Sequence, residues 1–349
     1  MRIAQVCPRY SPHIGGVETH VEEVGKRLAR KGHDVTVLTT DPSGRLPKSD
    51  TIEGVKVLRF PSIAPGDAYY LSLSLRSYMR KAEGFDVVHA HGYHAFPAYF
   101  AASAKAPRFI FTPHYHGHGH TAFRDLLLKP YALLGKRIFE RADRVICVSN
   151  FEKSLVCRDF KCNGKAAVIP NGVNKAEFQG PEPYPKGLKV ILYIGRLEEY
   201  KGVQYAIRAL PFLPWHRLHV IGKGPYKDSL VKEAIAAGVK DKVAFMADQP
   251  RPDLLRWYAT ADVFVMLSRF EAYGITVAEA LTAGVPCIVA SGSALSEFVG
   301  TSCKAVDLPV AGETLAEYIT AAQFKDMPGN VLDWDEVAER VLKVYEEGR

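Results

Sequence analysis

Cysteine is scarce in this chain, and the few cysteines are not spaced like metal ligands. Six occur in 349 residues, and Cys157 and Cys162 lie in one short stretch. No second pair follows them with the spacing of a structural zinc site. We therefore predict reduced thiols with structural roles, as in a cytoplasmic enzyme.

Long hydrophobic runs are also absent. No apolar stretch approaches the roughly 18–20 residues that are needed to span a bilayer. The first residues, Met1–Val6, have the pattern of a strand and lack the basic region and apolar core of a signal peptide. We expect a cytoplasmic protein without a membrane-spanning helix.

The first strand–helix turn lacks the dinucleotide fingerprint Gly-x-Gly-x-x-Gly, which argues against a nicotinamide-dependent dehydrogenase. It contains Gly15-Gly16 instead. Without a Cβ atom, these glycines let the backbone approach a ligand closely. A simple turn before the helix is the alternative explanation.

The length and the order of predicted elements indicate two α/β domains, each a doubly wound parallel sheet. Residues 180–187, rich in proline and glycine, are predicted to be the linker. We predict domains at 1–178 and 179–332 and a final helix within 333–349, with the ligand in a cleft faced by the carboxyl ends of both sets of strands. The predicted strands are 3–7, 34–38, 55–60, 86–90, 108–112, 144–148, 166–169, 189–194, 217–221, 243–247, 262–267 and 286–290. Helices are predicted at 17–31, 203–210, 226–237, 252–260, 276–283 and 333–347.

Positive charge is concentrated in the first half. Residues 1–170 contain 25 lysines and arginines against 15 acidic residues, and residues 171–349 contain 20 against 23. The asymmetry suggests that the first half meets an anionic partner or surface. A solvated basic face is the alternative, which charge alone favours.

Two glutamates separated by seven residues follow a predicted strand. Glu271 precedes a turn at Gly274, and Glu279 lies in the first turn of the next helix. The N–H groups at this helix start favour a phosphate. Glu271 can then accept hydrogen bonds from sugar hydroxyls, and Glu279 from a ribose diol. A capping box, Thr276-x-x-Glu279, is the alternative for Glu279 and leaves Glu271 unexplained.

Two cations follow the first strand of the second domain. Arg196 and Lys201 lie between Gly195 and Gly202. The planar guanidinium of Arg196 and the mobile ammonium of Lys201 can together hold a diphosphate. They can also stabilise the charge that develops as a nucleoside diphosphate leaves. We therefore predict no metal ion. Ordinary surface charge is the alternative, which the position after a strand and the glutamate pair disfavour.

Histidine is concentrated in residues 114–120, where four of seven residues are histidine. His114 directly follows a predicted strand, where its imidazole can hydrogen-bond a ligand. Metal binding is the alternative, although no carboxylate or cysteine cluster supports it. We place His116, His118 and His120 in a loop that follows this strand.

Another strand ends at His91, which we predict to face the cleft, whereas His89 is predicted to be a core histidine. Asn171 and Gly172 also follow a strand, where a tight turn and ligand contact are equally compatible with the sequence.

Together these motifs resemble glycosyltransferase family 4, whose members are retaining enzymes of the two-domain GT-B fold. The resemblance rests on Gly15-Gly16-Val17-Glu18, Asp86-Val87-Val88-His89-x-His91, Pro170-Asn171-Gly172-Val173, Gly195-Arg196 to Lys201-Gly202, Gly222-x-Gly224-Pro225 and Glu271-x7-Glu279. These elements run from about residue 1 to residue 300.

The resemblance implies two Rossmann-like domains that face a central cleft. The first would bind the acceptor, the second a UDP- or GDP-linked sugar as co-substrate, and the last helix would return to the first domain. The implied catalytic residues are His114, Glu271, Arg196 and Lys201. The implied donor-binding residues are Gly15, Gly16, Arg196, Lys201, Gly222, Gly224, Glu271, Tyr273, Gly274, Ile275, Thr276 and Glu279. On the acceptor side it implies His91 and His116.

The predicted reaction moves a hexose to an acceptor hydroxyl with retention. Because no residue is an obvious covalent nucleophile, we expect front-side attack, with the leaving phosphate oxygen taking the acceptor proton. A hydrolysing nucleotide-sugar epimerase and a non-catalytic sugar- or lipid-binding protein are the alternatives. The complete set of Glu, Arg and Lys favours the transferase. The acceptor stays open between a lipid-linked glycan, a phospholipid, a free sugar and a sugar phosphate.

Two basic segments rich in leucine and tyrosine, residues 69–81 and 123–141, bear on the membrane. Such segments can rest on an anionic leaflet, which would place the protein at the inner face of the membrane. The alternative is that their apolar stripes join the core. We predict no nucleic-acid partner.

Overall fold

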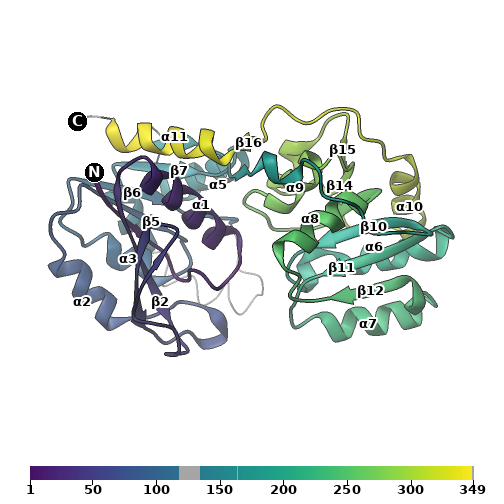
Figure 1. Cartoon of the computed structure of the whole chain (residues 1–349), viewed down its shortest axis with the longest axis horizontal. Coiled ribbons are helices and arrows are strands. Elements are labelled where there is room, and N and C mark those ends of the chain that lie inside the picture. The colour runs from purple at the N-terminus through teal and green to yellow at the C-terminus, as the bar shows by residue number, and fades with distance from the viewer. Residues whose placement is uncertain (118–133, 163, 348–349) are drawn as a thin grey trace. The chain divides into compact units, whose positions relative to one another are not determined.

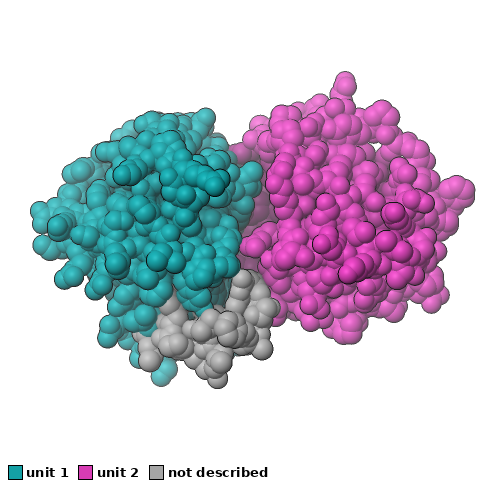
Figure 2. Space-filling view, turned by 90° about the horizontal axis from the view of Figure 1, so that it is seen from below, with its two compact units in different colours: residues 1–172, 334–349 teal, residues 173–333 magenta. Residues whose placement is uncertain are grey.

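The computed structural model describes residues 1–117, 134–162 and 164–347. The chain divides into two compact units, coloured teal and magenta in Figure 2. Unit 1 consists of residues 1–172 and the C-terminal stretch from Trp334, and unit 2 is Val173–Asp333. The chain therefore leaves unit 1 after Gly172 and returns to it at Trp334.

Unit 1 is built on an eight-stranded sheet with the order β3-β4-β2-β1-β5-β6-β7-β8. Strands β2, β5, β6 and β7 of this sheet are labelled in Figure 1. Neighbouring strands are parallel except for β3, which runs antiparallel to β4 at the edge. Every residue of β5 is buried, as is typical of a parallel sheet covered on both faces. The strands are β1 Arg2–Val6, β2 Asp34–Asp41, β3 Ser49–Ile52, β4 Val55–Pro61, β5 Val87–His91, β6 Arg108–Thr112, β7 Arg144–Cys147 and β8 Ala166–Val168.

The helices of unit 1 bury one apolar stripe each. In the first of them Val21, Val24 and Leu28 recur at helical spacing and are fully buried. Gly32, with φ of +85°, follows its end and stops the helix. The helices are α1 Gly16–Arg30, α2 Leu73–Lys81, α3 Phe96–Ala101, α5 Asn150–Phe160 and α11 Trp334–Glu346, with a 3-10 turn η1 at Pro65–Asp67. Residues 134–141 are helical as well.

Unit 2 contains a six-stranded parallel sheet with the order β12-β11-β10-β13-β14-β15. Its strands are β10 Lys189–Ile194, β11 His216–Ile221, β12 Val243–Met246, β13 Val263–Met266, β14 Cys287–Ala290 and β15 Cys303–Val306. Its helices are α6 Val203–Ala209, α7 Lys227–Ala236, α8 Arg251–Thr260, α9 Ile275–Thr282 and α10 Gly312–Ala321. The 3-10 turns are η2 Lys175–Phe178, η3 Glu199–Lys201, η4 Leu210–Phe212, η5 Lys240–Lys242 and η6 Ala294–Phe298. Two short strands, β9 Gly172–Val173 and β16 Leu332–Asp333, pair with each other.

Both sheets are doubly wound, as the sequence predicted. In unit 1 the chain proceeds from β1 to β2 on one side and returns to β5 on the other. In unit 2 it does the same with β10, β11 and β13. The connections diverge at the carboxyl ends of β1 and β5 and of β10 and β13, and such switch points are where open α/β sheets bind ligands.

Helix α11 completes the core of unit 1. The Tyr345 hydroxyl is fully buried, lies 2.7 Å from Nδ1 of His89 and accepts a hydrogen bond from Nε2 of Gln5 at 3.0 Å. At the other end of the helix, Nε of Arg27 in α1 donates to Asp335 at 2.6 Å. The last helix of the chain is therefore joined to its first strand, its first helix and β5.

The structure corrects the predicted linker at residues 180–187. This segment belongs to unit 2, where the hydroxyl of Tyr184 donates to Asp253 and Nζ of Lys186 donates to Asp262. Its prolines keep it free of regular structure, but these bonds fix it to α8 and the start of β13. The sequence also gave no prediction for β3, β15 or α10.

We expect Tyr345→Ala to lower the free energy of unfolding by about 3–5 kcal/mol, because it empties a fully buried aromatic site. Tyr345→Phe keeps the ring and loses the hydroxyl, and should cost about 1 kcal/mol. Urea unfolding followed by circular dichroism measures both. The control is Tyr318→Ala in α10, where the side chain is 39% exposed. Equal losses for Tyr345→Ala and Tyr318→Ala would show that α11 does not complete the core.

Candidate active site

Three loops of unit 2 approach one another so closely that they require glycine. Gly222, with φ of +149°, follows β11, and an added Cβ would lie 1.9 Å from the carbonyl oxygen of Gly195 after β10. Gly202, with φ of +77°, would place a Cβ 2.2 Å from the carbonyl oxygen of Leu267 after β13. Backbone atoms cannot yield as a side chain can, so any larger residue would separate the loops. Gly224 is confined in the same way by Leu197.

This packing brings together two predicted site residues that are far apart in sequence. Nζ of Lys201 lies 2.5 Å from Oε1 of Glu271, and both side chains are largely buried. Burial by itself lowers the pKa of the Lys201 ammonium, but Glu271 and Tyr200 outweigh it and the net pKa is raised. Arg196 lies in the same loop, is exposed and donates to Glu198 at 3.1 Å. Arg196 and Lys201 are thus two cations that follow β10, an exposed one paired with Glu198 and a buried one paired with Glu271.

The start of α9 offers uncapped N–H groups. Gly274 is its N-cap with φ of +111°, and an added Cβ would lie 2.5 Å from Cδ2 of Leu295. No side chain caps the helix, so the first N–H groups, at Ile275 and Thr276, have no partner within it. Helix starts of this kind bind anions. Tyr273 is buried beside Phe298, and its hydroxyl has no hydrogen-bond partner in the described part of the chain.

Glu279 is held from α8. Nη1 of Arg251 donates to its Oε1 at 2.6 Å, and the hydroxyl of Tyr258 donates to its Oε2 at 2.8 Å. Because Gly274, and not Thr276, is the N-cap, the capping-box interpretation is wrong. Arg251 and Tyr258 were not predicted from the sequence, since no local pattern joins residues more than 20 positions apart.

In unit 1, the predicted glycine pair opens α1. Gly15 is the N-cap, and no side chain caps the helix. A Cβ on Gly15 would lie 2.5 Å from Oε2 of Glu18, a buried carboxylate that accepts from Nε of Arg9 at 2.8 Å. Gly16 is the first helical residue. The pair therefore leaves a bare helix start beside β1.

Four histidines of unit 1, His20, His89, His91 and His114, form a cluster with ring centroids 4.1–6.0 Å apart. Besides its contact with Tyr345, His89 lies 2.8 Å from Oγ1 of Thr112 through Nε2, which confirms it as a core histidine. Burial lowers the pKa of His20 to about 4 and the pKa values of the other three well below their ordinary value. The imidazoles are therefore neutral at pH 7.

Unlike His89, whose two ring nitrogens both have partners, His91 and His114 each have a ring nitrogen without one among the described residues. His91 is fully buried, with Nε2 at 2.5 Å from Oε1 of Gln5, so the structure places it inside the core rather than on an open surface. His114 follows β6 with φ of +48°, a strained conformation for a residue with a side chain. Nδ1 of His91, Nε2 of His114 and Nε2 of His20 are buried with no hydrogen-bond partner among the described residues. Such nitrogens can bond a hydroxyl that enters the cluster.

Glu152 holds the loop that carries His114. Its Oε1 accepts from the backbone N–H of Tyr115 at 2.5 Å, and its Oε2 from that of Val148 at 2.6 Å. Burial raises the pKa of this carboxyl to about 8, against the lowering effect of the two N–H groups. The sequence signals Glu152 only as Ser149-x-x-Glu152, a capping-box pattern. Ser149 does cap α5, but the carboxylate of Glu152 binds the neighbouring loop.

Asn171 and Gly172 are packing residues in the structure. Oδ1 of Asn171 lies 2.7 Å from Nδ1 of His20, and the amide is buried. A Cβ on Gly172 would lie 2.7 Å from Cα of Trp334. Close approach to α11 therefore explains this glycine.

Among the described residues, no set of metal ligands surrounds the histidine stretch 114–120. His116 stacks on His94 with centroids 5.0 Å apart, and His118 and His120 lie outside the described residues. Within 1–117, 134–162 and 164–347, no three His, Cys, Asp or Glu residues are grouped to hold a metal ion.

The chain has one Asp-x-Asp sequence, Asp333-Trp334-Asp335, a pattern typical of metal-dependent GT-A enzymes. There Asp333 accepts from the N–H of Lys175, and Asp335 from Arg27.

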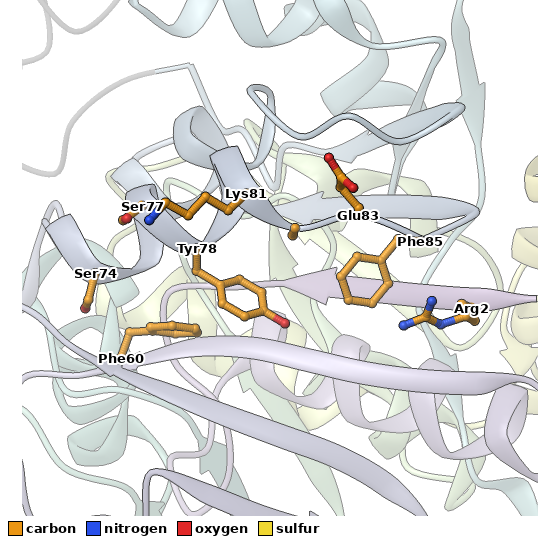
Figure 3. Close-up of a pocket in the computed structure, with 9 residues that line it drawn as sticks. Arg2, Phe60, Ser74, Ser77, Tyr78, Lys81, Glu83 and Phe85 are labelled. Atoms are coloured by element: carbon orange, nitrogen blue, oxygen red, sulfur yellow. The ribbon is translucent and has the colours of Figure 1, made fainter.

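The segment 69–81 is divided between core and surface. Leu75 and Met79 of α2 are buried, so part of its apolar stripe joins the core, whereas Leu71 and Leu73 are exposed. The helix borders a surface cavity of about 490 Å³, whose wall includes Tyr78 and which contains none of the predicted site residues (Figure 3). No described helix has the length and apolar character to cross a membrane. Most of the second basic segment, residues 123–133, lies outside the described residues.

Comparison with known proteins shows two adjoining family matches. The model described as Glycosyltransferase Family 4 matches residues 14–177, and the model described as Glycosyl transferases group 1 matches residues 174–321. The chain is 30% identical to a glycogen synthase of Mycobacterium tuberculosis, over 99% of this chain and 94% of the relative. It is 31% identical to the GDP-mannose:cellobiosyl-diphosphopolyprenol alpha-mannosyltransferase of Xanthomonas oryzae pv. oryzae, over 82% and 77%. Among solved structures, Anabaena HepE in complex with UDP shares the fold, with a TM-score of 0.79, 16% identity, and coverage of 99% of this chain and 100% of that one.

We expect acid to destabilise unit 1 through its histidine cluster. His20, with a pKa lowered to about 4, binds fewer protons when folded than when unfolded. Its contribution to stability is therefore complete above about pH 6.5 and is lost as the pH falls toward 4. His20→Gln should lose less stability than wild type between pH 7.5 and pH 5, as measured by urea unfolding. The control is His13→Gln at an exposed histidine, which should follow wild type. Parallel losses in all three proteins would contradict this origin of acid sensitivity.

Proposed function

The chain belongs to glycosyltransferase family 4, the glycosyl transferases group 1, and on this premise we propose which hexosyl transfer it performs. It moves a hexose from a UDP- or GDP-sugar to an acceptor hydroxyl, with retention of the anomeric configuration and without a metal ion. The observation that carries the proposal is the Lys201–Glu271 pair, held beside Arg196 and the uncapped start of α9 in unit 2.

Each part of that group has a role at the donor. The N–H groups of Ile275 and Thr276 and the cations Arg196 and Lys201 bind the diphosphate. Glu271, oriented by Lys201, accepts hydrogen bonds from hydroxyls of the sugar. Glu279, oriented from α8, accepts from the ribose. Gly222 and Gly224, which the close packing of the loops requires to be glycine, contribute backbone to the nucleotide site.

The proposed chemistry needs no covalent nucleophile. The bond between the anomeric carbon and the phosphate oxygen breaks, and the acceptor oxygen bonds to the same face of that carbon. The departing phosphate oxygen takes the acceptor proton. Lys201 and Arg196 stabilise the charge on the leaving group, the part that a divalent cation has in other transferases. His114, a neutral imidazole, hydrogen-bonds a sugar hydroxyl, and Gly15 and Gly16 leave room for the diphosphate.

The relatives bear on the choice of substrates. The name of the mannosyltransferase specifies GDP-mannose and a diphosphopolyprenol-linked acceptor, and HepE was solved with UDP. These names support a nucleoside-diphosphate sugar as donor and a glycan or lipid-linked glycan as acceptor. Unit 1 is the proposed acceptor-binding domain, with His116 and the buried His91 on the acceptor side.

We expect at least one of UDP, GDP and ADP to bind the protein in EDTA by calorimetry. Lys201→Ala should weaken that binding by about tenfold or more, because it removes a charge-assisted hydrogen bond to phosphate. Arg208→Gln, an exposed arginine of α6 that pairs with Glu233, is the matched control and should bind as wild type does.

Failure of all three nucleotides to bind, or binding only with added Mg²⁺, would contradict the proposal. Incubation with the sugar form of the bound nucleotide separates the alternatives. A hydrolysing epimerase would release nucleotide at full rate without an acceptor, and a non-catalytic binding protein would release none with any acceptor.

We further propose that unit 1 touches an anionic membrane surface through α2. Leu73 is 67% exposed, and Arg76 and Arg80 follow at three and seven positions, on the same face of the helix. Ile63, 71% exposed, pairs with Leu71 next to the helix start. Leucine beside arginine on one face suits the interface of an anionic leaflet.

We expect the protein to sediment with vesicles that contain phosphatidylglycerol, and less with vesicles of phosphatidylcholine alone. Leu73→Asp should weaken this binding by about tenfold, the loss of one inserted leucine. Ile235→Asp in unit 2, at a residue 54% exposed, is the control. Equal sedimentation of both variants, or no preference for the anionic lipid, would contradict the proposed contact.

A further inference from the structure

Arg251 links three parts of unit 2. Its Nε and Nη2 lie 2.9 and 2.8 Å from Oε2 of Glu177, and its Nη1 donates to Glu279 at 2.6 Å. Its guanidinium lies 5.4 Å from the ring centre of Phe178. Two carboxylates and one aromatic face thus fix the plane of the guanidinium. The start of α8 is joined in this way to η2 and to α9.

Tyr258 binds the other oxygen of the same carboxylate. It is fully buried in α8, two turns beyond Arg251, and donates to Oε2 of Glu279 at 2.8 Å. Its ring packs edge-on against Phe178, with centroids 5.7 Å apart. Each oxygen of Glu279 therefore receives one hydrogen bond from α8.

The two bonds leave a defined acceptor pair on Glu279. An ionised carboxylate offers about four lone-pair sites, two on each oxygen. Arg251 and Tyr258 use one on each oxygen, so one stays available on each. Two such sites on adjacent oxygens match two hydroxyls on neighbouring carbons. A single hydroxyl would leave one site without a donor, which is costly for a largely buried carboxylate.

We infer that Arg251 and Tyr258 are positioning residues that hold Glu279 for the cis-diol of a ribose, and so select ribonucleotides over 2′-deoxyribonucleotides. The inference rests on the proposed donor site and names the residues that determine its preference for ribose over 2′-deoxyribose. A carboxylate fixed before the ligand arrives loses no rotamer freedom on binding. It also discriminates against a ligand that lacks one hydroxyl, because its own acceptor then stays unpaired.

The test measures a ratio of affinities by calorimetry. The ligands are the nucleoside diphosphate that binds wild type best among UDP, GDP and ADP, and its 2′-deoxy analogue. Wild type should prefer the ribonucleotide by about tenfold, and Tyr258→Phe should reduce that preference by about threefold to fivefold. Arg251→Lys, which keeps the charge and loses the fork, should also reduce it. Arg256→Gln is the control. Arg256 lies on the same helix but donates to the carbonyl of Glu182 instead of Glu279, so this variant should keep the preference of wild type.

The possible results separate the inference from the function on which it rests. If no nucleotide binds, both fail. If wild type binds the two forms equally, or if Tyr258→Phe and Arg251→Lys weaken both forms by the same factor, the donor site stands and the positioning role is overturned. A merely structural role predicts that equal weakening, together with a lower melting temperature. A reduced ratio at an unchanged melting temperature supports positioning.

Discussion

The candidate site of unit 2 depends on the contact of backbone with backbone at the carboxyl ends of β10, β11 and β13. Gly222 and Gly202 approach carbonyl oxygens of the neighbouring loops at distances that exclude any side chain. This contact sets the separation of the loops, and the loops carry Lys201 and Glu271. The ion pair is therefore a consequence of where the backbone lies.

Unit 1 orders its site by other means. There the functional groups are neutral histidines in a buried polar cluster, and the main anchor is a carboxylate. Glu152 accepts from the backbone N–H of Tyr115 and so holds the loop in which His114 has a left-handed conformation that a side chain disfavours. Neutral groups suit contact with hydroxyls, whereas the cations of unit 2 suit contact with phosphate. The two chemistries reside in separate units.

The sequence predicts the sheets well because strands buried on both faces are continuous apolar runs, as at β6 and β10. Lys201 and Glu271 can be found from the sequence as well, because they lie in the loops that follow two of these strands. Prediction from the sequence fails where partners are distant in the chain. Arg251, Tyr258 and Glu152 act on carboxylates or loops that only the fold brings near, and no periodicity reveals them. The prediction for residues 180–187 was wrong for another reason. Their composition is typical of a linker, but Tyr184 and Lys186 bind this segment to the rest of unit 2.

The return of α11 to unit 1 has a consequence for the order in which a nascent chain matures on the ribosome. Gln5 and His89 are made early, yet Tyr345, which lies against both, is translated only after the whole of unit 2. All strands of the second sheet lie between those points in one uninterrupted segment. The N-terminal half must therefore wait with an open core while the later half can close, which reverses the usual N-to-C order of domain completion.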